Sequence, residues 1–168
     1  DSQAHPSLTD AARAAGIKAL PYGAGDMTHA TALLDRYKDE APLVMTDGVF
    51  AMHGRLAPLN ELLRYLPPGG ILVVDDCHGT GVLGQGGRGT AELFGIDDER
   101  LLITGSLAKA IGSGGGFIAG DAEHVAGVRR HAASFVGTTA LAPPLAAAAL
   151  ESLEIIEAEP GRLERLRA

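Results

Sequence analysis

Two short apolar runs, each leading directly into a polar cluster, constrain the fold of this chain more than any other feature. The first, residues 71–74, reads Ile-Leu-Val-Val and runs into Asp-Asp-Cys-His at residues 75–78. The second, residues 101–104, reads Leu-Leu-Ile-Thr and leads into a polar segment flanked by glycine, residues 105–112. Continuous apolar runs of this length are typical of buried parallel strands. Because ligands of open α/β sheets bind beyond the carboxyl ends of such strands, we expect both clusters to face one site.

The rest of the chain alternates between segments with helical and strand-like patterns. We predict helices at residues 10–16, 31–39, 58–66, 90–94 and 121–131, the last capped by Asp121, and strands at residues 17–22, 43–47, 71–75, 101–104 and 116–119. From residue 143 onward the pattern predicts one long helix. This alternation predicts an α/β fold with a doubly wound, mostly parallel sheet flanked by helices. Residues 1–150 would form one domain, and residues 151–168 a helix that leaves it.

Composition excludes several classes of protein. A net charge of −7 with only 14 lysines and arginines argues against a nucleic-acid-binding surface. No apolar run reaches the roughly 18 residues of a membrane-spanning helix. The single cysteine, Cys77, cannot form an internal disulfide, which fits a reducing compartment, and we expect a cytoplasmic protein. The sequence starts at Asp1 without a methionine and ends at Ala168 inside a charged helical pattern, so we expect a fragment.

Lys109 differs from the other two lysines in its surroundings. Lys18 follows a predicted helix end and Lys38 lies in a charged segment, whereas Lys109 stands among the apolar residues of segment 107–111. Partial desolvation there would favour the free amine, which a lysine that forms a Schiff base requires. The spacing alone is equally compatible with a surface lysine on a glycine-rich loop.

These clusters resemble the motifs of a known enzyme family. The segments Asp-Asp-Cys-His-Gly-Thr-Gly at residues 75–81, Gly-Arg-Gly at 87–89 and Ser-Leu-Ala-Lys-Ala-Ile-Gly at 106–112 are similar to those of the fold-type-I pyridoxal-phosphate enzymes. Within that group the chain resembles the α-oxoamine synthases, in the form found in 8-amino-7-oxononanoate synthases. The resemblance runs from Asp1 to Pro143 in the order and spacing of the family. It implies that residues 1–150 are an incomplete large domain and that residues 151–168 lead toward a small domain outside this sequence.

The resemblance assigns four residues to catalysis with pyridoxal 5'-phosphate. It implies that Lys109 forms the internal aldimine with the cofactor and moves the α-proton of the substrate. Asp75 would pair with the protonated pyridine nitrogen, which keeps the ring an electron sink. His5 would stack on the face of the ring, and His78 would lie near the ring hydroxyl.

Three further residues would bind the cofactor if the resemblance holds. Ser106 would contact the phosphate, Thr139 would reach the phosphate bound to a neighbouring subunit, and Asp47 matches an acid of the family. The contact through Thr139 implies a homodimer. The implied reaction condenses an amino acid with an acyl thioester of coenzyme A or of an acyl carrier. The alternative within the same fold is an aminotransferase or another fold-type-I activity. We expect no metal, nucleic-acid or membrane partner, on the grounds of charge, apolar run length and ligand motifs.

Three positions depart from the pattern of the family. Ala51 stands where the synthases usually have serine, His53 replaces an acid, and Ser106 replaces a threonine while keeping the hydroxyl. The change at Ala51 removes a hydrogen-bonding group, so the amino-acid and acyl specificity of the family is not transferred to this chain.

Three hypotheses from other classes use the same residues differently. Gly79, Gly81 and Gly84 satisfy the G-x-G-x-x-G pattern of a dinucleotide-binding domain, but no helical pattern follows directly. Cys77 and His78 would need another histidine to bind a metal, and the chain lacks a second paired ligand motif. The last hypothesis is an inactive binding or scaffold fragment.

Overall fold

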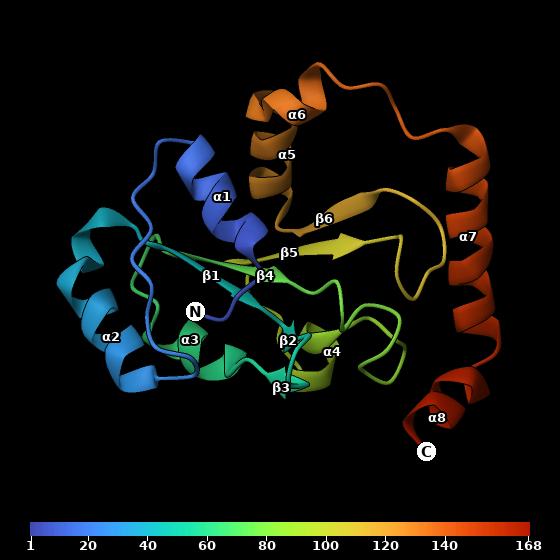
Figure 1. Ribbon diagram of the computed structural model, residues 1–168, viewed down its shortest axis with the longest axis horizontal. Helices are drawn as coiled ribbons and strands as arrows, with labels where there is room; N and C mark the ends of the chain where they lie inside the picture. The colour runs from blue at the N-terminus through green and yellow to red at the C-terminus, as the bar shows by residue number, and fades with distance from the viewer.

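A four-stranded sheet forms the centre of the computed structural model, which describes residues 1–168 (Figure 1). The strand order is β1 (Leu43–Asp47), β4 (Ile71–Asp75), β5 (Leu101–Ser106) and β6 (Gly116–Gly120). The first three strands run parallel, and β6 runs antiparallel to β5. The prediction of a mostly parallel sheet is confirmed.

The register of the parallel strands aligns their carboxyl ends. Asp47, the last residue of β1, pairs with Asp75, the last residue of β4, and Asp75 in turn pairs with Thr104 of β5. The sheet therefore places the polar clusters of the sequence side by side at one edge.

Helices lie on both sides of this sheet, which confirms the doubly wound architecture (Figure 1). They are α1 (Pro6–Ala14), α2 (Met27–Arg36), the 3-10 helix η1 (Lys38–Glu40), α3 (Leu59–Tyr65), α4 (Thr90–Phe94), α5 (Ala122–His131), α6 (Ala133–Val136), α7 (Pro143–Ala158) and α8 (Gly161–Arg167). In Figure 1, α1, α5 and α6 lie above the sheet and α3 and α4 below it, while α7 and α8 lie on the side toward which β5 points. A small hairpin of β2 (Val49–Phe50) and β3 (Arg55–Leu56) follows β1 directly.

Two local predictions were wrong. Residues 17–22 form no strand; Ile17 is 57% exposed, and Pro21 has no amide hydrogen to donate to a neighbouring strand. The long helix expected from residue 143 is broken between α7 and α8, where Pro160 interrupts it and Glu159 leaves the helical conformation (φ −122°, ψ 64°). By contrast, Asp121 caps α5 as predicted, by accepting a hydrogen bond from the amide of Glu123.

The hydrophobic core lies between the parallel strands and the helices α2 and α3. Its buried residues are Tyr22, Ala30, Leu34, Val44, Phe50, Ala57, Leu59, Leu62, Leu63, Leu66, Leu72, Val74 and Leu101. The central strand β4 supplies Leu72 and Val74, both 0% exposed, so the strand that ends at Asp75 is held firmly in the core. The structure contains no helix with the length and apolar character that crossing a membrane requires.

Candidate functional site

Two carboxylates lie side by side where β1 and β4 end. Asp47 is 7% exposed and Asp75 is half-buried, and the two residues are register neighbours. Asp75 accepts a hydrogen bond from the amide of Cys77 (3.1 Å), but no ion pair of the structure involves either carboxylate. Both carboxylates therefore lie at the edge of the sheet without an ion-pair partner in the structure.

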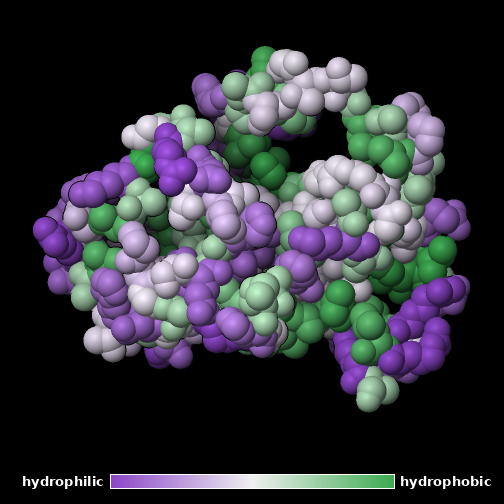
Figure 2. Space-filling model, in the orientation of Figure 1, coloured by the Kyte–Doolittle hydropathy of each residue, from purple (hydrophilic) through white to green (hydrophobic).

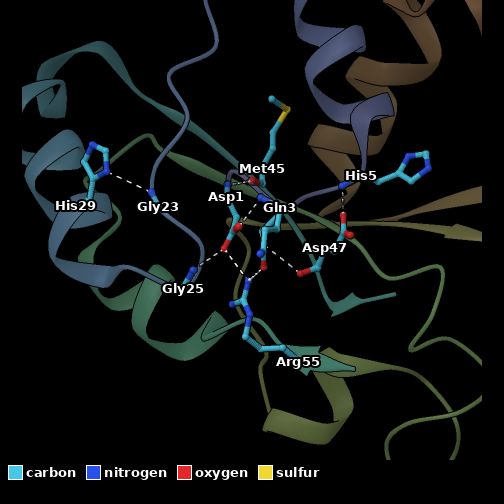
Figure 3. Close-up of polar contacts among 10 residues, drawn as sticks. Asp1, Gln3, His5, Gly23, Gly25, His29, Met45, Asp47 and Arg55 are labelled. Carbon is cyan, nitrogen blue, oxygen red and sulfur yellow. Dashed lines mark hydrogen bonds and ion pairs between the residues drawn. The ribbon is translucent and has the colours of Figure 1, made fainter. Parts of the chain in front are cut away.

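His5 joins this pair from the segment before α1. Its backbone N–H donates to Asp47 Oδ1 (2.9 Å), and its ring points away from that carboxylate (Figure 3). The ring nitrogen Nδ1 lies 2.7 Å from Ser7 Oγ and accepts the Ser7 amide (3.3 Å), so the side chain caps α1. This cap fixes the orientation of the imidazole and leaves Nε2 as its free nitrogen.

Three of the expected site residues, His5, Asp75 and His78, act on the pKa of Asp47. Burial raises the pKa of Asp47, and the charge of Asp75 raises it further. The His5 N–H and the positive charges of His5 and His78 act in the opposite direction on the same pKa. The strand register places Asp47 beside Asp75, the backbone contact places His5 at Asp47, and His78 follows Asp75 by three residues.

Lys109 lies on the turn that follows β5. Within this turn Ser106 Oγ accepts the amide of Ala108 (3.1 Å), and the carbonyl of Lys109 accepts the amide of Gly112 (2.9 Å). The expectation of partial burial is wrong for this chain alone, because Lys109 is exposed. The turn extends past the end of the sheet, and Ile111 is the one residue of the expected apolar surroundings that is buried.

Cys77 lies next to the Asp75 carboxylate, which accepts its amide hydrogen. Burial raises the pKa of the Cys77 thiol to about 11, helped by its hydrogen bond to Asp75, while the charge of Lys109 acts to lower it. The thiol is therefore protonated and unreactive at neutral pH. Asp75 ends β4, and Lys109 follows the end of the neighbouring strand β5, so both lie beyond the same edge of the sheet.

Thr139 is not brought to this cluster. It lies exposed in the segment between α6 and α7, residues 137–142, and makes no hydrogen bond in the structure. Its expected contact with a neighbouring subunit stays a prediction.

Asp76 is a buried anchor that the sequence analysis missed. It is 0% exposed and accepts hydrogen bonds from both the amide (2.9 Å) and the hydroxyl (2.8 Å) of Thr90. A Cβ atom at Gly79 or Gly89 would collide with its carboxylate, so these glycines make room for it. Successive residues of a strand point to opposite faces, and this alternation would have separated Asp76 from Asp75.

The glycine-rich loop does not have the geometry of a dinucleotide-binding motif. Turns and bends continue to Gly87, Arg88 forms an isolated β-bridge with Thr80, and the next helix, α4, begins only at Thr90. The carboxylate of Glu92 accepts the amides of Gly86 and Arg88, so these donors are already used within the chain. A pyrophosphate would meet no free helix N-terminus here.

A metal site at Cys77 and His78 is not supported either. The structure contains no group of three or more histidine, cysteine, aspartate or glutamate side chains placed to hold a metal ion.

Known proteins match this chain along its whole length. It is 42% identical over 167 residues to a protein described as a putative 8-amino-7-oxononanoate synthase from Desulforudis audaxviator, covering 99% of this chain and 44% of that relative. It is 38% identical over 168 residues to a serine palmitoyltransferase from Sphingobacterium spiritivorum, covering 99% of this chain and 42% of the relative. The chain thus spans less than half of the length of these relatives.

The fold is found in solved enzymes as well. A structure of serine palmitoyltransferase with a pyridoxal-phosphate internal aldimine superposes with a TM-score of 0.89 at 27% identity, covering 99% of this chain and 42% of that one. Residues 1–168 also match the family described as aminotransferase class I and II. The mostly parallel sheet and the aligned strand ends agree with the fold of these enzymes, and the family match covers the full chain. The chain belongs to the aminotransferase class I and II family.

Proposed function

We propose that this chain is the cofactor-binding part of a pyridoxal-phosphate-dependent acyltransferase of the α-oxoamine synthase type, which condenses an amino acid with an acyl thioester. The observation that carries the proposal is the arrangement at the sheet edge: Asp47 and Asp75 end adjacent strands without a cationic partner, and Lys109 follows the next strand. Its support from relatives is that their names include both 8-amino-7-oxononanoate synthase and serine palmitoyltransferase.

The residues of the site fit pyridoxal phosphate. A protonated pyridine nitrogen would supply the positive charge that Asp75 lacks in this chain. The exposed amine of Lys109 suits an aldehyde, and the hydroxyls of Ser106 and Thr139 suit a phosphate. When bound, the cofactor supplies an electron sink for the charge left on an amino acid that loses its α-proton.

Each side chain then has a distinct task. With the cofactor bound, Asp75 would keep a proton on the ring nitrogen, and Lys109 Nζ would accept and return the α-proton of the substrate. His5, whose ring is fixed by Ser7, would cover one face of the ring. His78 would lie near the ring hydroxyl.

The proposal extends to the organisation of the whole protein. Residues 1–150 are the large domain, and α7 and α8 lead from it toward the part of the relatives that this chain does not span. A homodimer would bring Thr139 of one copy to the phosphate bound by another. Cys77, which has no cysteine to pair with, fits a cytoplasmic location. Ala51 and His53 lie exposed at the tip of the β2–β3 hairpin, and we assign no amino-acid or acyl specificity from them.

Covalent capture tests the assignment of Lys109. The protein as encoded, incubated with pyridoxal phosphate, should show a visible absorption band, and borohydride reduction should fix the cofactor on the peptide that contains Lys109. Lys109→Ala should lose the band, while Lys38→Ala, a change at an exposed lysine paired with Asp35, should keep it. A label on another residue, or an unchanged band in Lys109→Ala, contradicts the assignment.

The reaction type is tested separately through Asp75. Asp75→Asn should keep the cofactor bound but slow the exchange of the substrate α-proton with heavy water, by roughly 10²- to 10³-fold. The exposed Asp97→Asn serves as control. Product formation from an amino acid and an acyl-CoA supports the acyltransferase. Transfer of the amino group from an amino acid to a 2-oxo acid, without any reaction with acyl-CoA, would identify an aminotransferase instead.

A further inference from the structure

An arginine outside the cofactor site holds the segment that carries His5. Arg55 lies on β3, with its guanidinium stacked over the ring of Phe50, 3.8 Å from Cζ to the ring centroid. The same group donates from Nη2 to Asp1 Oδ2 and to Gln3 Oε1, each at 3.3 Å (Figure 3). We call Arg55, Asp1 and Gln3 the arginine brace.

The arginine brace includes a buried carboxylate with several hydrogen-bond donors, unlike an ion pair on the surface. The side chain of Asp1 is only 1% exposed, and its two oxygens also accept the amides of Gly25 (2.9 Å) and Gln3 (2.8 Å). Gly25 has a positive φ of 66°, and a Cβ atom there would come within 2.9 Å of Arg55 Nη1. The guanidinium therefore occupies a cradle that a larger residue at position 25 would narrow.

The brace is continuous with the site. Two residues after Gln3, the His5 N–H donates to Asp47 Oδ1. The hairpin that carries Arg55 begins directly after Asp47, and Gly48 ties its start to the sheet by donating to the carbonyl of Asp75 (2.8 Å). Residues 1–5 are thus held by Arg55 through side chains and by Asp47 through the His5 N–H, and the amide of Ser2 adds a backbone hydrogen bond to the carbonyl of Tyr22 (2.9 Å).

We propose that Arg55 is a positioning residue, which through Asp1 and Gln3 sets the place of His5 and keeps the His5 N–H on Asp47. The inference rests on the proposed function in so far as His5 and Asp47 serve a bound cofactor. Arg55 itself touches neither the cofactor nor the substrate in this role.

A comparable pair elsewhere in the chain shows why Arg55 should matter. Arg13 and Asp10 form an ion pair within α1, with side chains 79% and 63% exposed. Exposed pairs of this kind contribute little. Breaking the brace instead leaves the buried carboxylate of Asp1 without its charged partner, which displaces the segment.

Displacement of the segment has a predictable electrostatic consequence at Asp47. The charged groups that act on the pKa of Asp47 are Asp75, His5 and His78, and its one backbone donor is the His5 N–H. Weakening that donor removes a contact that lowers the pKa of Asp47. The acid side of any pH profile that depends on ionised Asp47 should then move to higher pH.

The test compares Arg55→Ala, Arg55→Lys and the control Arg13→Ala in the protein as encoded. Hydrogen–deuterium exchange of the peptide that contains His5, measured without cofactor, reports on the segment directly. With pyridoxal phosphate bound, the acid midpoint of the absorption band and kcat/KM report on the site. All variants are first checked for cooperative unfolding.

We expect Arg55→Ala to speed exchange in residues 2–5, raise the acid midpoint and lower kcat/KM by roughly 10- to 100-fold. Arg55→Lys should fall between wild type and Arg55→Ala, because an ammonium lacks the planar fork of the guanidinium. Arg13→Ala should change none of these values. In a double-mutant cycle, Asp1→Asn with Arg55→Ala should have no larger effect than the greater single change.

Two results overturn the inference: wild-type exchange and midpoint in a folded Arg55→Ala variant, or an equal response of Arg13→Ala. If Arg55→Ala does not fold, Arg55→Lys decides by the same measurements. A wild-type protein without any cofactor band would refute the proposed function instead, and the exchange measurement would still decide on the brace.

Discussion

Residues 22–101 and the C-terminal part of the chain, from β6 onward, bury their apolar residues very differently. All residues of the hydrophobic core lie between Tyr22 and Leu101, and Leu62 of α3 is 0% exposed. From β6 onward, α5 buries no residue, α7 buries only Ala149 and α8 only Leu163. Figure 2 shows apolar surface along α7, where Leu150 is 59% exposed and Leu153 44%.

This difference divides the chain into a packed part, residues 22–101, and an open part, from β6 onward, whose apolar side chains are largely exposed. The packed part, residues 22–101, fixes Asp47 and Asp75 at the sheet edge by its own contacts. The open part carries Thr139 and borders the exposed turn of Lys109. Exposed apolar surface of this size commonly marks an interaction surface, and the chain spans less than half of the length of its relatives.

The largest effect should come from the packed part. Leu62→Ala should lower the free energy of unfolding by about 3 kcal/mol, because it leaves a cavity where nothing is exposed. Leu150→Ala, the same change on α7, should lower it by less than about 0.5 kcal/mol. Urea unfolding of both variants measures the contrast. Equal losses would mean that α7 is packed in solution and that the comparison fails.

A second, smaller loss is expected at the buried anchor of the glycine-rich loop. Asp76→Ala leaves the amide and hydroxyl of Thr90 without their acceptor, which should cost about 2 kcal/mol. Asp97→Ala, at an exposed acid, is the matched control. Exchange of the amides in residues 79–90 should rise in Asp76→Ala; unchanged exchange there would show that Asp76 does not hold the loop.

The ionisation of Asp47 should make the free energy of unfolding depend on pH. Because burial raises its pKa in the folded state, the folded protein binds this proton more tightly than the unfolded chain does. Stability from this group is therefore greatest below the ordinary aspartate pKa and falls as pH rises toward the raised value. Asp47→Asn, whose Oδ1 can still accept the His5 N–H, should flatten the stability curve in this range.

The measurement is urea unfolding of wild type and Asp47→Asn at a series of pH values, with Asp97→Asn as reference. Parallel curves for wild type and Asp47→Asn would show that the pKa of Asp47 is the same in the folded and unfolded states.

The sequence predicted what depends on local pattern. The apolar runs located β4 and β5, the helix Thr90–Phe94 was predicted with its observed bounds, and Asp121 was identified as a cap. These features follow from periodicity and capping, which act over a few residues. The aligned strand ends followed from one further rule, that parallel strands share their carboxyl edge.

What the sequence could not show depends on contacts between distant residues. The ion pair of Arg55 with Asp1 joins positions 54 residues apart, and no local pattern marks it. The role of Asp76 depends on Thr90 and on glycines that make room for it. Lys109 is exposed because no other segment of this chain covers its side chain. Apolar neighbours in the sequence did not by themselves create a buried environment.

The smallest effect on folding should be found on α7, and it tests the open face directly. Leu150→Ser and Leu153→Ser replace exposed side chains, so the free energy of unfolding of this 168-residue chain should stay within about 0.5 kcal/mol of wild type. Their effect should appear in association instead, because removing exposed apolar surface weakens contacts between copies. Sedimentation velocity over a range of concentrations should show self-association of the unmodified chain and less of it in the double variant. Ser152→Leu, on the same helix, should have the opposite effect if its side chain adds to this face. A chain that stays monomeric at all concentrations, with or without the serine substitutions, would show that the exposed leucines of α7 form no contact between copies.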